Sequence, residues 1–332
     1  MRDVVLGLSG GVDSAVSARL LQRAGYRVHG LFLDIGNASA RADAEAAADF
    51  LGIGLRVLDV SAQLEREVCA PFAASYLRGE TPNPCILCNP AVKFKALLAY
   101  ADELGGAALA TGHYARAEGG GLYRGRSAND QSYMLCRITR EQLARLVLPL
   151  GGMEKTETRA LAAELGLPVA KKPDSMEICF IPDNDYCGWL SRRVSLPKPG
   201  VFVRKGVEIG AHEGIFRWTV GQRIPGVYDG EKLYVRAIDP ATGQIEVCPD
   251  AELWRTEVEA SAFHWLIDPP DGAVRGSVKV RHSKTAEAPC TAYPQPDGGA
   301  YIVCDAPVRA PAPGQSAVLY DGDRVLGGGF LV

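Results

Sequence analysis

The sequence has no apolar run long enough to cross a membrane, which excludes a protein anchored by membrane-spanning helices. It has no excess of basic charge, because 36 Lys and Arg residues against 39 Asp and Glu residues give a net charge of -3. This argues against a uniformly basic nucleic-acid binder but leaves local basic patches open. No signal peptide precedes the first predicted strand, so we expect a cytoplasmic location. The nine cysteines then indicate reduced thiols rather than a disulfide framework.

A glycine-rich turn near the N-terminus is the most informative segment that is present. The run L-S-G-G-V-D-S at 8–14 follows an apolar run at 4–6 and opens into a helical pattern. Two glycines allow a tight turn that brings backbone N–H groups close to an anion. The start of the helix adds free N–H donors and the positive end of a dipole, and Ser9 and Ser14 add hydroxyls. The segment therefore predicts a phosphate cradle at the first strand–helix junction.

This cradle lacks the Gly-Lys-Ser/Thr signature of the P-loop NTPases. A cradle without that lysine suits pyrophosphate that is held as a leaving group. The pattern S-G-G-x-D-S resembles the PP-loop of ATP pyrophosphatases, which adenylate a substrate with ATP and release pyrophosphate. The plain alternative is an ordinary glycine-rich turn between a strand and a helix.

The sequence patterns divide the chain into an α/β part and a β-rich part. Strand patterns at 27–33, 55–60 and 107–111 alternate with helical patterns at 41–51 and 92–104, which indicates a parallel sheet with helices on both faces. After Pro197, glycine and proline separate short alternating runs, which are typical of antiparallel strands; they lie at 232–238, 276–281, 300–304 and 316–320. We predict an ATP-binding catalytic domain at 1–196, a β-rich linker domain at 197–255 and a β-barrel domain at 256–332.

Two cysteine-bearing segments complete the set of motifs. The segment T-P-N-P-C-I-L-C-N at 81–89 is predicted to be a proline-framed loop with two thiols, and D-S-M-E-I-C-F-I-P-D at 174–183 carries a third. With these segments, the chain resembles the tRNA-specific thiouridylases of the MnmA family. Further matching segments follow in the same order over nearly the whole chain: K-F at 93–94, G-H-Y-A-R at 112–116, D-Q-S-Y at 130–133, K-x-E-T-R at 155–159, G-Q-R at 221–223 and P-G-Q-S-A-V-L-Y-D-G-D-x-V-L-G-G-G at 313–329.

The resemblance implies both a fold and a reaction. The implied fold is an adenine nucleotide α-hydrolase-like domain with a parallel sheet, then a small β-rich central domain and a C-terminal β-barrel. The implied reaction replaces the C2 oxygen of the wobble uridine of tRNA by sulfur, after ATP and Mg²⁺ have activated that oxygen as an adenylate. The implied sulfur source is a cysteine desulfurase or a sulfur-carrier protein.

The resemblance also implies residue roles. Cys179 matches the cysteine that carries a persulfide. Cys88 matches the partner cysteine that attacks the persulfide or closes a disulfide. Asp13 is the third predicted catalytic residue. The implied ATP-binding residues are Leu8, Ser9, Gly10, Gly11, Asp13, Ser14, Leu33, Gly112 and His113. The predicted tRNA-binding residues are Asn83, Asn89, Lys93, Asp130, Gln131, Ser132 and Arg281. For Lys93 and Arg281 the plain alternative is a solvated surface charge.

Three alternatives remain open. Cys85 stands where many family members carry aspartate, and three thiolates from Cys85, Cys88 and Cys179 suit a [4Fe-4S] cluster whose free iron binds sulfide. Zinc is disfavoured because a second C-x-x-C is lacking.

The chain is also compatible with another PP-loop enzyme, such as an amidotransferase-type synthetase, or with a non-catalytic paralogue that binds tRNA or a cluster. The segment 34–40 is shorter than in many relatives, which leaves its role near ATP or tRNA open.

Overall fold

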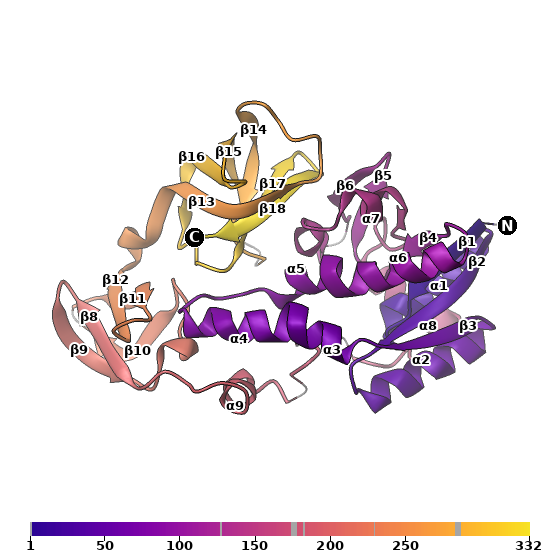
Figure 1. Ribbon diagram of the computed structural model, residues 1–332, viewed down its shortest axis with the longest axis horizontal. Coiled ribbons are helices and arrows are strands. Elements are labelled where there is room, and N and C mark those ends of the chain that lie inside the picture. The colour runs from indigo at the N-terminus through magenta and orange to yellow at the C-terminus, as the bar shows by residue number, and fades with distance from the viewer. Residues whose placement is uncertain (1, 127, 174–177, 182, 229, 283–286) are drawn as a thin grey trace. The chain divides into compact units, whose positions relative to one another are not determined.

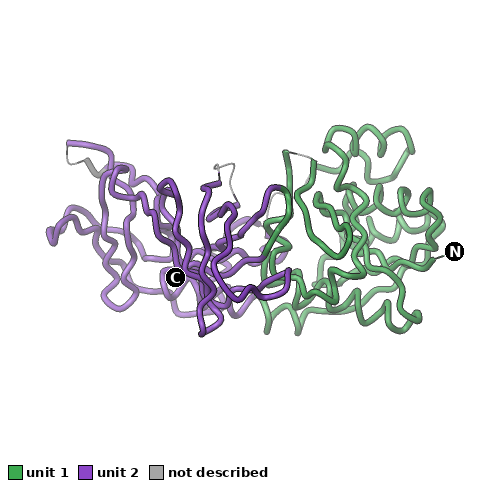
Figure 2. The backbone as a smooth tube through the Cα atoms, turned by 90° about the horizontal axis from the view of Figure 1, so that it is seen from above, with its two compact units in different colours: residues 1–68, 85–176, 323–326 green, residues 69–84, 177–322, 327–332 purple. Residues whose placement is uncertain are grey.

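The computed structural model describes residues 2–126, 128–173, 178–181, 183–228, 230–282 and 287–332. The chain forms two compact units, which Figure 2 shows in separate colours. Unit 1 comprises residues 1–68, 85–176 and 323–326, and unit 2 comprises residues 69–84, 177–322 and 327–332. The units are therefore interleaved in the sequence.

A five-stranded parallel sheet forms the centre of unit 1 (Figure 1). Its strands, in spatial order, are β3 (Gly54–Asp59), β2 (Tyr26–Asp34), β1 (Arg2–Gly7), β4 (Ala108–Ala110) and β7 (Leu146–Val147). All four pairings are parallel. The strand order reverses between β1 and β4, so the carboxyl ends of these two strands flank the crevice in which doubly wound sheets bind ligands.

Helices cover both faces of this sheet because the side chains of the strands alternate between the faces. Helices α1 (Val12–Arg23), α2 (Ala38–Leu51) and α8 (Lys155–Glu164) share one core with Val4 and Leu6 of β1. Val5, between them, is also fully buried, and α6 (Phe94–Glu103) contacts β1 and β4. The glycine-rich turn and the start of α1 are thus fixed on a sheet that is buried on both sides.

The rest of unit 1 consists of a hairpin and short helical segments. Strands β5 (Ala115–Glu118) and β6 (Gly121–Arg124) form the hairpin, and the first residues of β18 (Arg324–Leu331) pair with β6. The short helical segments are α3 (Ser61–Leu64), the π-helix η1 (Glu65–Cys69), α5 (Pro84–Cys88), the π-helix η2 (Asn89–Lys93), the 3-10 helix η3 (Ser132–Leu135) and α7 (Arg140–Ala144).

Unit 2 contains an open sheet and a closed barrel. The open sheet, in spatial order, consists of β10 (Arg223–Tyr228), β11 (Lys232–Asp239), β12 (Gln244–Pro249), β8 (Gly200–Arg204) and β9 (Val207–His212). The barrel strands, in spatial order, are β13 (Trp254–Trp265), β16 (Ala300–Arg309), β15 (Ala288–Pro294), β14 (Val274–Lys279), β17 (Ser316–Asp321) and β18. The helical segments are α4 (Ala70–Leu77), α9 (Tyr186–Ser191), η4 (Ile215–Arg217) and η5 (Asp250–Leu253).

The barrel closes because β13 pairs with β16 on one side and with β18 on the other. Glycine makes this closure possible. A Cβ atom on Gly327 would lie 2.2 Å from the carbonyl oxygen of His264, so any larger residue would push β18 away from β13.

These observations confirm the predicted fold class: a parallel α/β sheet, a β-rich middle region and a C-terminal barrel. The predicted strands and helices lie within a few residues of the observed ones. One segment differs, because the predicted proline-framed loop carrying Cys85 and Cys88 is helical in α5. Pro84 at the first helical position explains this, since its fixed φ suits a helix start. The domain boundaries at 196 and 255 stay predictions.

Candidate functional site

The glycine-rich loop lies directly after β1, and its shape is set by main-chain contacts. Gly10 has φ +73, and a Cβ atom there would lie 2.4 Å from the carbonyl oxygen of Ala40 in α2. Ser14 is buried; its Oγ donates to the carbonyl of Gly11 at 2.9 Å and accepts the backbone N–H of Ser9 at 3.2 Å. The backbone of the loop is therefore pressed against α2 and tied to the first turn of α1.

Helix α1 begins at this loop without a side-chain cap. Gly11, its N-cap residue, is in an extended conformation and carries no side chain that could accept the first N–H groups. Helix starts of this kind direct backbone donors and a partial positive charge at an anion. Phosphate binding at this helix start stays a prediction.

The carboxylate of Asp13, in the first turn of α1, is the charged centre of the site. Its two oxygens lie 2.8 and 2.7 Å from the Nζ atom of Lys155, and the hydroxyl of Tyr114 donates to it at 2.9 Å. Lys155 is the first residue of α8, and its ammonium also lies 5.5 Å from the centre of the Tyr114 ring. Three elements of unit 1 thus converge on one carboxylate beside the loop.

A second lysine fixes the loop itself. The Nζ atom of Lys172 donates to the carbonyl of Gly10 at 3.0 Å and to the carboxylate of Asp43 in α2 at 2.5 Å. This bridge ties the loop to α2 at the same place where Gly10 touches Ala40. Lys172 therefore supports the position of the loop.

The residues after β4 form the other side of the crevice. Gly112 packs against the first turn of α1, since a Cβ atom there would lie 3.0 Å from the backbone nitrogen of Ser14. The ring of His113 stacks on Phe94, and its Nδ1 atom lies 2.7 Å from the hydroxyl oxygen of Thr111. Burial, with a smaller contribution from the charge of Lys93, holds the pKa of His113 well below 6.5, so the ring is neutral at pH 7.

The two leucines predicted to bind ATP differ in exposure. Leu8 is buried, and its N–H donates to the carbonyl of Leu31 at 2.9 Å, which extends the pairing of β1 with β2 into the loop. Leu33 is half-buried near the carboxyl end of β2. Both lie at the edge of the sheet that carries the glycine-rich loop.

Helix α5 carries Cys85 and Cys88, three residues apart and so on one helical face. Cys85 is exposed and Cys88 half-buried, while Ile86 between them is fully buried. The π-helix η2 starts at the next residue, and π-helical turns are frequent at functional sites. Helix α5 therefore presents both thiols toward the surface of unit 1.

The side chain of Asn89 supports η2 from inside. It is 1% exposed, donates to the carbonyl of Met134 at 2.8 Å and accepts from the Nζ atom of Lys93 at 2.9 Å. Its predicted contact with tRNA stays a prediction, and the observed bonds give it a supporting position under the Cys88 helix. Lys93 is half-buried at the end of η2.

The predicted tRNA-binding segment at 130–132 is tied to the start of β5. Asp130 accepts from the N–H of Gly125 and from the hydroxyl of Ser132, at 2.9 and 2.8 Å. The side-chain oxygen of Gln131 accepts the N–H of Tyr114 at 3.0 Å, and Ser132 is fully buried. This segment therefore holds the backbone of Tyr114, whose hydroxyl reaches Asp13.

Cys179 lies in a short turn of unit 2 and is exposed. Its neighbours anchor the turn: Ile181 is buried, and the ring of Phe180 lies 5.5 Å from Phe72 and 5.3 Å from Trp189. The exposed thiol is thus followed directly by two apolar anchors. The motif residues 174–177 and 182 lie outside the described residues.

Two more predicted tRNA-binding residues lie in unit 2. Arg281 donates to the carbonyls of Val220 and Ala310, at 2.5 and 2.9 Å, and so joins the open sheet to the barrel. Asn83 is half-buried, directly before α5. Both stay predictions for tRNA contact.

Burial separates three other cysteines from any sulfur chemistry. It raises the pKa of the Cys136 and Cys290 thiols to about 12 and that of Cys304 to about 11. Thiols of this kind are almost entirely protonated at neutral pH and react slowly. They pack as apolar side chains.

Comparisons with known proteins place this geometry in a family. Residues 2–183 match the family profile described as tRNA methyl transferase HUP domain, residues 190–249 the PRC-barrel domain of the same name, and residues 255–331 the aminomethyltransferase β-barrel domain. A tRNA-specific 2-thiouridylase MnmA of Rhodospirillum rubrum is 45% identical, with 99% of this chain and 95% of that protein aligned. The chain belongs to the tRNA-specific 2-thiouridylase family.

Other members of the thiouridylase family align equally fully. The MnmA proteins of Methylobacterium radiotolerans and Syntrophotalea carbinolica are 44% and 41% identical over 99% of this chain, with 93% and 98% of those proteins covered. A solved complex of a 4-thiouridine synthetase with RNA and ATP is 19% identical, with 57% of this chain and 50% of that chain covered and a TM-score of 0.38.

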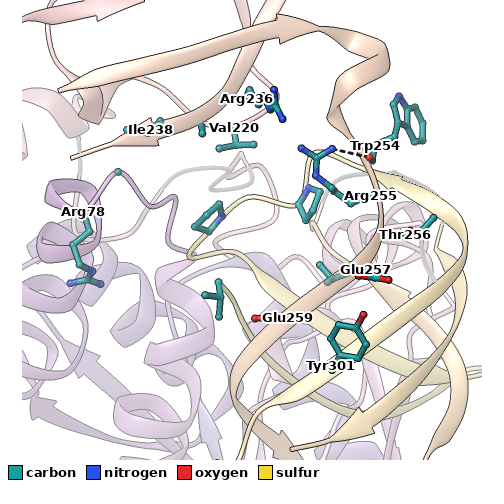
Figure 3. A pocket seen from close by; sticks show the side chains of 16 residues that line it. Arg78, Val220, Arg236, Ile238, Trp254, Arg255, Thr256, Glu257, Glu259 and Tyr301 are labelled. Carbon is teal, nitrogen blue, oxygen red and sulfur yellow. Dashed lines mark hydrogen bonds between the residues drawn. The ribbon is translucent and has the colours of Figure 1, made fainter. Parts of the chain in front are cut away.

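Unit 2 of this thiouridylase-family chain also contains a wide groove of about 590 Å³, shown in Figure 3. Arginine and glutamate side chains both line it. Its Arg236 is paired with Glu246 and Glu252, and Arg78 is paired with Glu80. This balance of charge differs from the excess of basic residues on surfaces that hold a phosphate backbone.

No group of three His, Cys, Asp or Glu side chains that could hold a metal ion occurs within the described ranges. No helix among the described residues is both long and apolar enough to cross a membrane.

Four residues that contact the glycine-rich loop or Asp13 were not among the predicted site residues: Lys155, Lys172, Tyr114 and Asp43. For Lys155 and Tyr114 a signal existed, because both lie in segments that match the family, K-x-E-T-R and G-H-Y-A-R.

Proposed function

We propose that the chain catalyses ATP-dependent 2-thiolation of the wobble uridine in tRNA, through adenylation of the C2 oxygen and sulfur transfer from a cysteine persulfide. One observation carries the proposal. The S-G-G-V-D-S loop lies at the crevice between β1 and β4, in a chain that aligns over 99% of its length with proteins named tRNA-specific 2-thiouridylases.

In the first half-reaction, the C2 oxygen of uridine attacks the α-phosphorus of ATP. The bond from that phosphorus to the bridging oxygen breaks, and pyrophosphate leaves with the electron pair. The loop from Ser9 to Ser14 binds the leaving group with backbone N–H groups. A carboxylate is a ligand that Mg²⁺ prefers, so Asp13 fits a Mg²⁺ ion, which would neutralise charge on the leaving pyrophosphate. Neutral His113 and Gly112 form the wall of the nucleotide pocket.

In the second half-reaction, Cys179 carries the persulfide. Its terminal sulfur attacks C2 of the adenylated base, and AMP leaves with the electron pair of the C2–O bond. The thiolate of Cys88 then attacks the inner sulfur of Cys179, which leaves one sulfur on the base and closes a disulfide. A thiol reductant must supply two electrons for the next turnover. The exposed position of Cys179 supports loading by a cysteine desulfurase or a sulfur-carrier protein.

The position of Cys85 favours a second candidate mechanism for the sulfur-transfer step. It is exposed and shares a helical face with Cys88. These two thiolates, with Cys179 as a third, have the donor chemistry of a [4Fe-4S] cluster with one open iron. A bound cluster would supply sulfide directly, and Cys179 would then be a ligand rather than a persulfide carrier.

For the tRNA, we propose binding through phosphate contacts, in the cytoplasm, with an affinity that falls steeply as salt rises. Asn89, Ser132 and Arg281 have their side chains bonded within the protein. We propose that these three side chains hold neighbouring backbone segments in place for contact with tRNA. Lys93, at the end of η2, donates one of its three ammonium hydrogens to Asn89, and we propose the remaining donors for a direct phosphate contact.

A strictly anaerobic thiolation assay tests the function. It combines protein, ATP, Mg²⁺ and unmodified tRNA with either free sulfide or a desulfurase and cysteine, and reads 2-thiouridine by mass spectrometry with iron measured on the same sample. Cys88→Ser and Cys179→Ser are expected to abolish the product, whereas Cys187→Ser, in α9, serves as the matched control and retains it.

Cys85→Asp separates the two sulfur routes. The persulfide route predicts retained activity, because many relatives are expected to carry aspartate there, and the cluster route predicts loss of both iron and product. Release of pyrophosphate from ATP and tRNA without any thiouridine would point to another PP-loop substrate. Absence of pyrophosphate release would favour a non-catalytic tRNA-binding protein.

A further inference from the structure

We infer that Lys155 binds the β- and γ-phosphates of ATP, supplying from α8 the positive charge that the glycine-rich loop itself lacks. This positive charge is paired with the carboxylate of Asp13. The inference rests on the proposed function, because it assigns a residue to the triphosphate of the proposed ATP site.

The first ground is what the loop does not contain. In P-loop proteins the lysine of Gly-Lys-Ser/Thr reaches the β- and γ-phosphates. Here the corresponding run after the glycines is Val12-Asp13-Ser14, which places a negative charge where a cation would be useful. A triphosphate beside an unneutralised carboxylate would be repelled.

The second ground is where the missing cation is found. The Nζ atom of Lys155 lies 2.7 and 2.8 Å from the two oxygens of Asp13, although the two residues are 142 positions apart in sequence. The side chains of Lys155 and Asp13 are 18% and 29% exposed, so the pair is open to solvent at one side. A ligand that approaches the loop can therefore reach this ammonium.

The third ground is local electrostatics. Lys155 is the first residue of α8, where the partial charge of the helix is positive and a lysine is unfavourable. Asp13 offsets this cost, and the Tyr114 hydroxyl holds the carboxylate in place. An incoming triphosphate brings more negative charge than the carboxylate, so the ammonium is expected to turn to the phosphates and to uncover Asp13.

Lys172 has a different task. Its ammonium is bonded to the Gly10 carbonyl and to Asp43, so it acts on the phosphates only through the position of the loop. Lys171, the neighbouring residue, is exposed and serves as a matched control of equal charge.

The test measures binding of ATP, ADP, AMP and pyrophosphate by calorimetry to the full chain. Lys155→Met is expected to weaken ATP and pyrophosphate binding by about 10- to 100-fold, the range for one charged hydrogen-bonding group, and to change AMP binding by less than about threefold. Lys155→Arg is expected to restore most of the affinity for ATP. Lys171→Met is expected to bind all four ligands as the unaltered chain does.

A double variant separates direct contact from repulsion by an uncovered Asp13. If Lys155 contacts the phosphates, Asp13→Asn with Lys155→Met binds pyrophosphate more weakly than Asp13→Asn alone, with both variants measured without Mg²⁺. Full recovery of pyrophosphate binding in that double variant would overturn the inference. So would an equal loss of ATP and AMP binding in Lys155→Met, which is the result for a purely structural lysine.

The proposed function and this inference fail differently. An unaltered chain that binds neither ATP nor pyrophosphate overturns both. An unaltered chain that binds ATP, together with a Lys155→Met variant that binds it equally well, overturns the inference alone. If Lys155→Met does not fold, the Lys155→Arg variant and the charge-neutral double variant still decide.

Discussion

The glycine-rich loop of unit 1 and the Cys179 turn of unit 2 are held in opposite ways. The loop rests on main-chain contacts, and Gly10 touches α2 so closely that no further atom fits. The turn is held by the side chains of its own neighbours, Phe180 and Ile181, while Cys179 stays exposed. A phosphate cradle depends on where the backbone N–H groups lie, whereas a sulfur carrier needs a side chain that is anchored and accessible.

Gly10→Ala should have the largest effect on stability and ATP binding, because it disturbs the contact with Ala40 that shapes the loop. The new Cβ would meet the Ala40 carbonyl in a backbone conformation that already disfavours alanine. We expect a loss of roughly 2–5 kcal/mol in the free energy of unfolding and a loss of ATP binding. Urea denaturation and calorimetry measure the two effects.

Gly25→Ala is the matched control for that substitution. Gly25 has φ +82, and an added Cβ atom would have no neighbouring atom within 4 Å, so only the conformational cost of about 1–2 kcal/mol applies. Equal losses of stability for the two variants, with ATP binding kept in both, would show that the contact with Ala40 does not shape the loop.

Phe180→Ala should have an intermediate effect and should spare the loop. It removes the ring contacts with Phe72 and Trp189, at a cost of about 2 kcal/mol for a partly exposed ring. We expect thiolation from the Cys179 persulfide to fall while ATP binding stays unchanged. Phe50→Ala, at an exposed position of α2, is the control. A Phe180→Ala protein that thiolates tRNA normally would contradict the anchoring role.

His113→Asn should have the smallest effect, and only at low pH. Because burial keeps the pKa of His113 well below 6.5 in the folded chain, the unfolded chain binds a proton below about pH 6.5 that the folded chain does not. Through this group the free energy of unfolding is therefore unaffected at pH 7.5 and is lower by up to about 1.4 kcal/mol at pH 5.5.

The variant cannot titrate at position 113, so it should lack this part of the pH dependence. Urea denaturation of both proteins at pH 7.5 and 5.5 gives the difference. An identical pH dependence in the two proteins would mean that the pKa of His113 is not lowered in the folded chain.

Local pattern was enough for much of the fold. The expected helix at 41–51 is observed within α2, which ends at Gly52 with φ +65, the left-handed residue that a helix stop prefers. The expected run at 232–238 is observed as β11. These features depend on residues close together in sequence, so a single chain reveals them. The Cys88 segment was harder, because prolines favour both loops and helix starts.

The candidate site was predictable only in part. Ser9, Gly10, Gly11, Asp13 and Ser14 form one short motif, so the sequence alone was enough to predict a cradle there. The partners of that motif come from far along the chain. No local pattern indicates that Lys155 reaches Asp13, or that Lys172 reaches the Gly10 carbonyl, because both contacts join residues that are far apart in the sequence.

The sequence by itself thus determined the elements, the glycine turn and the thiols, since each follows from backbone preferences and residue chemistry within a few positions. The tertiary structure decided which charges face each other: Asp13 with Lys155, and Asp43 with Lys172. It also decided which cysteines are buried, with raised pKa values, and which are exposed. The physical reason is that burial and Coulomb interaction depend on distance in space, which packing sets and separation in sequence does not.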